Sequence, residues 1–128
     1  MTTENLAVLF SDVVGSTELS LAMAPEAADE ARRGYFSVLR EAVVATGGHE
    51  VKGLGDGIMV IFASASAALG CAVAMQQGVE HDNRERAYSV GLRIGLSGGE
   101  VTADDDGDYY GDAVIEAARL CEIGRAHV

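Results

Sequence analysis

The stretch AVLFSDVVGST at residues 7–17 predicts a buried strand that runs directly into a polar turn. Residues 7–13 are mostly apolar, as in a short strand inside a protein core. In the turn that follows, Ser16 and Thr17 are residue types that cap a helix start. The stretch therefore places one carboxylate, Asp12, where a buried strand gives way to a loop.

The stretch HEVKGLGDGIMVIF at residues 49–62 predicts a hairpin. Its two strands are expected at residues 49–54 and 57–62, around a tight Gly-Asp-Gly turn. This turn carries a second carboxylate, Asp56, again at the end of a strand.

The other elements follow from helical and alternating apolar patterns. Pro25 suits the first turn of the main helix, which Gly47 and Gly48 stop. The remaining elements are a helix capped by Ser64, a strand at residues 89–97, an acidic loop at residues 102–107 and a helix at residues 112–121. The predicted order is βαββαβα.

This order predicts an α+β fold of the ferredoxin-like, split βαβ kind, with an antiparallel sheet and the helices on one face. In that plan the first and third strands are antiparallel neighbours, so the end of one lies beside the start of the other. We therefore expect Asp12 and Asp56 to converge at one rim of the sheet, alongside the backbone amides of residues 14–17.

The length, charge and apolar content of the chain indicate which kinds of partner it can bind. The chain has 128 residues, 48% of them hydrophobic, which suits one compact domain. A formal charge of −11 disfavours binding to nucleic acid, and no apolar run has transmembrane length or signal-peptide form. Cys71 and Cys121 lie in apolar helical patterns, which predicts buried, reduced thiols. We expect a cytoplasmic protein without nucleic-acid or membrane contacts.

Two converging carboxylates have two interpretations. As an all-oxygen pair without His or Cys they suit Mg²⁺ or Mn²⁺, and two ions there would support phosphoryl chemistry. An Asp in a turn also serves turn hydrogen bonding. Spacing alone leaves both interpretations open.

Three motifs together resemble class III adenylate and guanylate cyclases. Two of them match the family's metal motifs and the third its nucleotide-binding region. They are FSDVVGST at residues 10–17, VKGLGDG at residues 51–57, and DYYGDAV at residues 108–114 with AARL at residues 117–120. The order and spacing of all three are those of the family, which a single motif could not establish.

The resemblance implies a site for ATP and two Mg²⁺ or Mn²⁺ ions. Asp12, Asp56 and the carbonyl of Val13 would bind the ions, and Arg119 would stabilise the transition state. Backbone and side chains at Val14, Gly15, Ser16 and Thr17 would cradle the phosphates.

Lys52 and Asp108 match the family pair that contacts the purine. A Lys donor and an Asp acceptor suit adenine over guanine, so the expected product is cyclic AMP. The family builds each site across a two-fold interface, so we also expect a homodimer.

One position departs from the family pattern. Four residues before Arg119 the family often has an Asn that orients the ribose, and here Ile115 stands. A weakly active pseudo-cyclase that binds ATP or dimerises is therefore the alternative. A diguanylate cyclase is disfavoured because its hairpin reads Gly-Gly-Asp/Glu-Glu-Phe.

The sequence at residues 122–128 matches the translation of a common sequencing adapter, which predicts a non-native tail after a cyclase domain at residues 1–121. The family fold continues with further strands, a helix and a lysine that contacts the triphosphate. The 128-residue chain is therefore expected to be inactive on its own.

Overall fold

The computed structural model describes residues 2–15, 21–86 and 90–126, and the side chains of residues 124–126 are not described. The elements follow the predicted order, with one short strand, β5, added before the last helix. They are β1 (Thr2–Val14), α2 (Pro25–Ala45), β2 (His49–Gly53), β3 (Ile58–Phe62), α3 (Ala65–Arg86), β4 (Gly91–Ala103), β5 (Tyr109–Tyr110) and α4 (Asp112–Ala126).

The strands form one antiparallel sheet in the order β2-β3-β1-β4-β5. β1 pairs with β3 through Ala7↔Phe62 to Phe10↔Met59, as predicted for the first and third strands. On its other side β1 pairs with β4 along its whole length. The α+β fold class is therefore confirmed.

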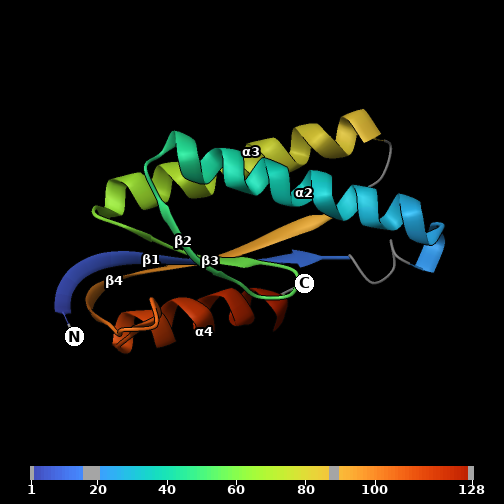
Figure 1. The fold of residues 1–128 in the computed structure, drawn as a ribbon. Helices are drawn as coiled ribbons and strands as arrows, with labels where there is room; N and C mark the ends of the chain where they lie inside the picture. The colour runs from blue at the N-terminus through green and yellow to red at the C-terminus, as the bar shows by residue number, and fades with distance from the viewer. Residues whose placement is uncertain (1, 16–20, 87–89, 127–128) are drawn as a thin grey trace.

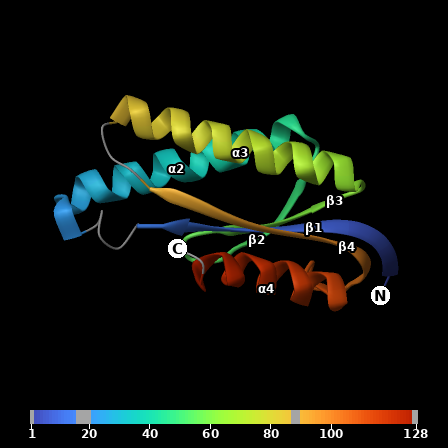
Figure 2. The same cartoon turned by 180° about the vertical axis from the view of Figure 1, so that it is seen from behind.

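Two layers of helices cover the sheet (Figures 1 and 2). α2 and α3 lie side by side on one face, as predicted, and α4 lies on the opposite face, which corrects the expectation that all helices share one face. The reason is β3, which is buried along its whole length. Val60 and Phe62 join the core under α2 and α3, whereas Met59 and Ile61 join a second core with α4. A strand without a polar side needs cover on both faces.

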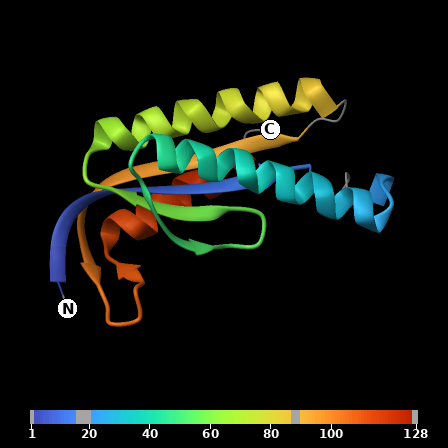
Figure 3. The same cartoon turned by 45° about the horizontal axis from the view of Figure 1, so that its top comes forward.

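Local chemistry sets the ends of the helices. α2 begins with Pro25 and ends where the N–H of Gly48 donates to the carbonyl of Val43 (3.0 Å), with Gly47 in the left-handed region at φ 74°. Ser64 caps α3, because its Oγ accepts from the N–H of Ala67 (3.1 Å). The β2–β3 hairpin then lies beside α2 (Figure 3).

Other sequence predictions have mixed outcomes. Cys71 and Cys121 are free and buried, as predicted. Among the described helices none has the length and apolarity to cross a membrane. α4 continues to Ala126, past the predicted domain boundary at residue 121, and the non-native origin of the tail stays a prediction.

Candidate active site

The rim of the sheet brings Asp12 and Asp56 together, as predicted. Asp12 lies near the end of β1, and Asp56 lies in the turn between β2 and β3. The backbone N–H of Val13 donates to the carbonyl of Asp56 (3.2 Å). The two acidic residues are thus fixed by the main chain, independently of their side chains.

Close packing of the hairpin against β1 maintains this rim. Oγ of buried Ser11 accepts from the N–H of Ile58 (3.1 Å). A Cβ on Gly57 would lie 1.6 Å from the carbonyl oxygen of Ser11, so only glycine allows the two segments to approach this closely. The turn itself is closed by the N–H of Leu54, which donates to the carbonyl of Gly57 (2.8 Å).

Tyr35 contacts the rim from the side of α2. Its side chain is 5% exposed, and its hydroxyl donates to the carbonyl of Asp56 (3.4 Å). Burial, and then the charges of Asp12 and Asp56, raise the pKa of Tyr35 above its usual value. Tyr35 therefore stays protonated and acts as a donor to the turn.

Arg93 of β4 forms an ion pair with Asp12, directly opposite it in the β1–β4 register. The Arg93 side chain is only 10% exposed, and its Nε is buried without a hydrogen-bond partner among the described residues. Sequence reasoning missed this residue. The available signal was a charged residue between Leu92 and Ile94, in the otherwise apolar stretch at residues 90–96.

Arg32 of α2 pairs with Asp56 in a similar way. Its Nη1 donates to Oδ1 of Asp56 (2.8 Å), and its Nη2 donates to the carbonyl of Gly55. This residue was also missed, because nothing in the helical pattern of α2 distinguishes it from a solvated arginine. Each rim carboxylate thus has an arginine of its own chain as a partner.

A cavity of about 260 Å³ adjoins this rim on the face that α4 covers. Asp12 and Phe10 of β1 line it from one side, and Ala118 and Cys121 of α4 line it from the other. Burial, and then the charge of Asp12, raise the pKa of the Cys121 thiol, so this thiol stays protonated. Space is therefore present next to the Asp12 carboxylate.

The residues fit a hard divalent cation by their donor chemistry. Asp12 and Asp56 supply carboxylate oxygens and Val13 supplies a carbonyl, the ligand types that Mg²⁺ and Mn²⁺ prefer. The two arginine partners show that these carboxylates attract cations in the folded chain. No cluster of three His, Cys, Asp or Glu side chains suited to a metal occurs among the described residues, so carbonyl, water or phosphate oxygens would have to complete the coordination.

Lys52 and Asp108 form a second pair. Nζ of Lys52 donates to Oδ2 of Asp108 (2.9 Å). Lys52 lies in β2 and Asp108 directly precedes β5, and these are the two edge strands of the sheet. The bond from Lys52, and then one from the N–H of Tyr109, lower the pKa of Asp108, which keeps it ionised. Side chains 56 positions apart thus present one donor group and one acceptor group together.

The acidic loop before β5 holds Asp108 in place. Oδ1 of Asp104 accepts from the N–H groups of Asp106 (2.9 Å) and Asp108 (3.0 Å). Gly107 takes a left-handed φ of 86° within this turn. Asp104 therefore has a turn role, which leaves the Asp108 carboxylate to contact Lys52.

The third predicted component, Arg119, lies on the outer side of α4. It is exposed, and it forms no ion pair or side-chain hydrogen bond with the residues that the structure describes. The inner side of α4 packs so closely on β4 that a Cβ on Gly95 would lie 2.1 Å from the carbonyl oxygen of Ala117. Ile115 is 56% exposed, and with Arg119 it belongs to the solvent-facing residues of this helix.

The predicted phosphate-binding segment is described only in part. Val14 ends β1, and Gly15 follows it with a left-handed φ of 92°, a conformation that glycine adopts readily. Ser16 and Thr17 lie outside the described residues. Their predicted contact with phosphate stays a prediction.

The model of the adenylate and guanylate cyclase catalytic domain matches residues 1–127. The chain belongs to this cyclase family. Among curated relatives, an adenylate cyclase of Streptomyces coelicolor is 33% identical over 96% of the chain, and an adenylate cyclase of Anabaena cylindrica is 31% identical over 92%. The chain spans only 31% and 27% of the lengths of these two relatives.

Solved structures agree with this assignment. The adenylyl cyclase CyaB from P. aeruginosa has a TM-score of 0.83 at 26% identity, and the match covers 96% of this cyclase domain and 74% of that chain. An adenylate/guanylate cyclase/hydrolase from Silicibacter pomeroyi has a TM-score of 0.77 at 33% identity, covering 96% of this chain and 72% of that one. The guanylyl cyclase Cya2 has a TM-score of 0.81 at 23% identity, so the shared fold does not distinguish ATP from GTP.

Proposed function

We propose that this cyclase domain is an adenylate cyclase that converts ATP to 3′,5′-cyclic AMP and pyrophosphate. The observation that carries the choice of ATP is the Lys52–Asp108 pair, with 2.9 Å between Nζ and Oδ2. Adenine presents an acceptor at N1 beside a donor amine, whereas guanine presents the reverse arrangement. A fixed ammonium next to a fixed carboxylate matches adenine.

Asp12, Asp56 and the carbonyl of Val13 would hold two Mg²⁺ or Mn²⁺ ions. When bound, such ions neutralise the triphosphate and lower the pKa of the ribose 3′ hydroxyl. The 3′ oxygen forms a bond to the α-phosphorus, the bond to the pyrophosphate oxygen breaks, and the hydroxyl proton passes to solvent. The amides of residues 14–17 would cradle the phosphates, as backbone N–H groups at the start of a loop commonly do.

Arg119 would stabilise charge at the α-phosphate from a second copy of the chain. Its exposure on α4, without a partner among the described residues, supports a role outside its own subunit. Leu120 and Ile123, which are 43% and 45% exposed, add apolar surface to the same helix. A two-fold homodimer would bring Arg119 of one chain to the carboxylate rim of the other, forming two equivalent sites.

A second candidate is a weakly active pseudo-cyclase. The observation that favours it is Ile115, which cannot form a hydrogen bond with a ribose and which is exposed near Arg119 on α4. Such a protein would act as an ATP-binding or dimerisation module, and it differs from the first candidate in its low turnover.

One assay separates these functions. It uses the completed domain, meaning this chain extended to the length of the solved cyclase domains, with Mn²⁺ and either ATP or GTP. We expect cyclic AMP from ATP and little cyclic GMP from GTP. Predominant cyclic GMP would overturn the substrate choice, and nucleotide binding without product would favour the pseudo-cyclase.

A further inference from the structure

Arg32 is held at Asp56 by more contacts than an ordinary surface arginine. Besides Oδ1 of Asp56 (2.8 Å), its guanidinium contacts the carbonyl of Gly55 in the same turn. It also lies over the ring of Phe36, with 5.3 Å from Cζ to the ring centroid. Three groups therefore fix the guanidinium at the rim.

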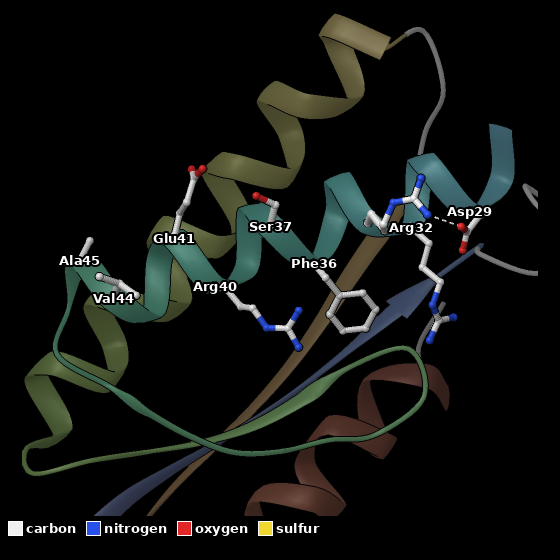
Figure 4. A pocket seen from close by; sticks show the side chains of 9 residues that line it. Asp29, Arg32, Phe36, Ser37, Arg40, Glu41, Val44 and Ala45 are labelled. Carbon is white, nitrogen blue, oxygen red and sulfur yellow. Dashed lines mark hydrogen bonds and ion pairs between the residues drawn. The ribbon is translucent and has the colours of Figure 1, made fainter. Parts of the chain in front are cut away.

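Phe36 and Arg40 extend this arrangement along α2. Arg40 lies over the same ring at 5.3 Å and forms two hydrogen bonds with Glu50 of β2 (2.9 and 3.1 Å). Figure 4 shows Arg32, Phe36 and Arg40 along the side of α2 that borders the β2–β3 hairpin. α2 thus contacts both the beginning of β2 and the turn of the hairpin through arginines that share one aromatic ring.

From this geometry we propose that Arg32 is an internal counter-cation for Asp56, which a divalent metal ion must displace in order to bind. The inference rests on the proposed function, because it takes Asp56 as a metal ligand. It assigns to α2 a role in setting the metal affinity of the site. Arg32 is then a positioning residue that acts through Asp56, and it does not itself contact the substrate.

Exposure and charge determine the direction of the effect. The Asp56 side chain is 36% exposed, so a dissolved cation can reach it. The ion must either take Oδ1 from Arg32 or bind beside a positive charge, and both weaken its binding. Without metal, Arg32 neutralises one of two neighbouring carboxylates and attaches the hairpin to α2. Arg32 therefore stabilises the metal-free rim and weakens metal binding.

The test measures Mn²⁺ binding to the purified 128-residue chain by calorimetry or by the spin resonance signal of free Mn²⁺. Arg32→Gln is compared with Arg33→Gln, which removes the same charge from the next residue of α2. Arg33 pairs with Asp29 of its own helix and is 70% exposed, so it is a matched control. Asp56→Asn tests whether the Mn²⁺ ion binds at Asp56.

We expect Arg32→Gln to bind Mn²⁺ about fivefold more tightly than the native chain, the scale of one exposed ion pair. Arg33→Gln should change the affinity by less than about twofold. Mn²⁺ should also raise the melting temperature of Arg32→Gln more than that of the native chain. Arg32→Lys, which keeps the charge but loses the forked contact, should give an intermediate affinity.

Unchanged or weaker Mn²⁺ binding in Arg32→Gln, relative to Arg33→Gln, would overturn the counter-cation role. Weaker binding would show instead that Arg32 orients Asp56 for the metal, and unchanged binding would show that Arg32 does not affect the metal. Cyclic AMP formation by the completed domain would then still support the proposed function. If Asp56→Asn binds Mn²⁺ as well as the native chain, both the counter-cation role and the metal site at the rim are wrong.

Discussion

The carboxylate rim and the outer side of α4 differ in how far a single chain satisfies their charged groups. At the rim, Asp12 pairs with Arg93 and Asp56 pairs with Arg32, and a main-chain hydrogen bond joins the two segments. On α4, Arg119 is exposed and has no partner among the described residues. The rim is thus assembled within one chain, whereas α4 presents a charged group that is available to another molecule. This difference is the structural basis for proposing a shared site.

The largest expected effect comes from the rim. In the completed domain Asp12→Ala or Asp56→Ala should abolish cyclase activity, because each removes a proposed metal ligand and leaves the triphosphate charge uncompensated. We expect a loss above about 10³-fold, measured as cyclic AMP formed with Mn²⁺. Substantial activity in either variant would remove the two-metal mechanism.

A substitution of Arg119, on the outer side of α4, should lower the activity nearly as much as the rim substitutions do. It should leave the stability of the domain almost unchanged. Arg119→Ala should lower kcat by roughly 10²–10³-fold through lost stabilisation of the transition state. Its melting temperature should stay close to that of the native domain, because the side chain is exposed and unpaired among the described residues. A large loss of stability would show that Arg119 has a structural role instead.

Within the rim, Gly57→Ala tests whether the main chain positions the carboxylates. The added methyl group would overlap the carbonyl of Ser11, so we expect a loss of about 3 kcal/mol in the free energy of unfolding. Gly53→Ala in the same hairpin is the control, since a Cβ there would meet nothing within 4 Å. Equal effects of the two variants in chemical denaturation would contradict the close approach.

The smallest effect is expected at Ile115 on α4. Ile115→Asn should raise kcat by about fivefold, because one neutral hydrogen bond to the ribose contributes roughly 1 kcal/mol. A higher KM without a higher kcat, or no change in either, would mean that the site does not need an amide at this position.

Local sequence patterns predicted the helices and strands, and the split βαβ plan predicted which strands are neighbours. The convergence of Asp12 and Asp56 followed from pairing between the first and third strands. The side of the sheet that α4 covers was not predicted, although the unbroken apolar run of β3 was a signal for cover on both faces.

The arginine partners of the rim could not be predicted in the same way. Arg93 pairs with Asp12 because the β1–β4 register places the two residues opposite each other, and Arg32 pairs with Asp56 because α2 lies close to the hairpin. Both pairs therefore depend on tertiary packing. Lys52 and Asp108 were matched only through the family resemblance, because the edges of a sheet are not expected to meet unless the sheet curls.

Mixing two inactive variants tests the shared site most directly. Asp12→Ala and Arg119→Ala, each prepared as the completed domain, are combined under conditions in which subunits exchange, and cyclic AMP formation is measured. In a mixed dimer both defects fall in one site and the other site is intact. Random pairing gives about half mixed dimers, so we predict recovery to about a quarter of the native activity. No recovery, with subunit exchange demonstrated, would contradict a site shared between two chains.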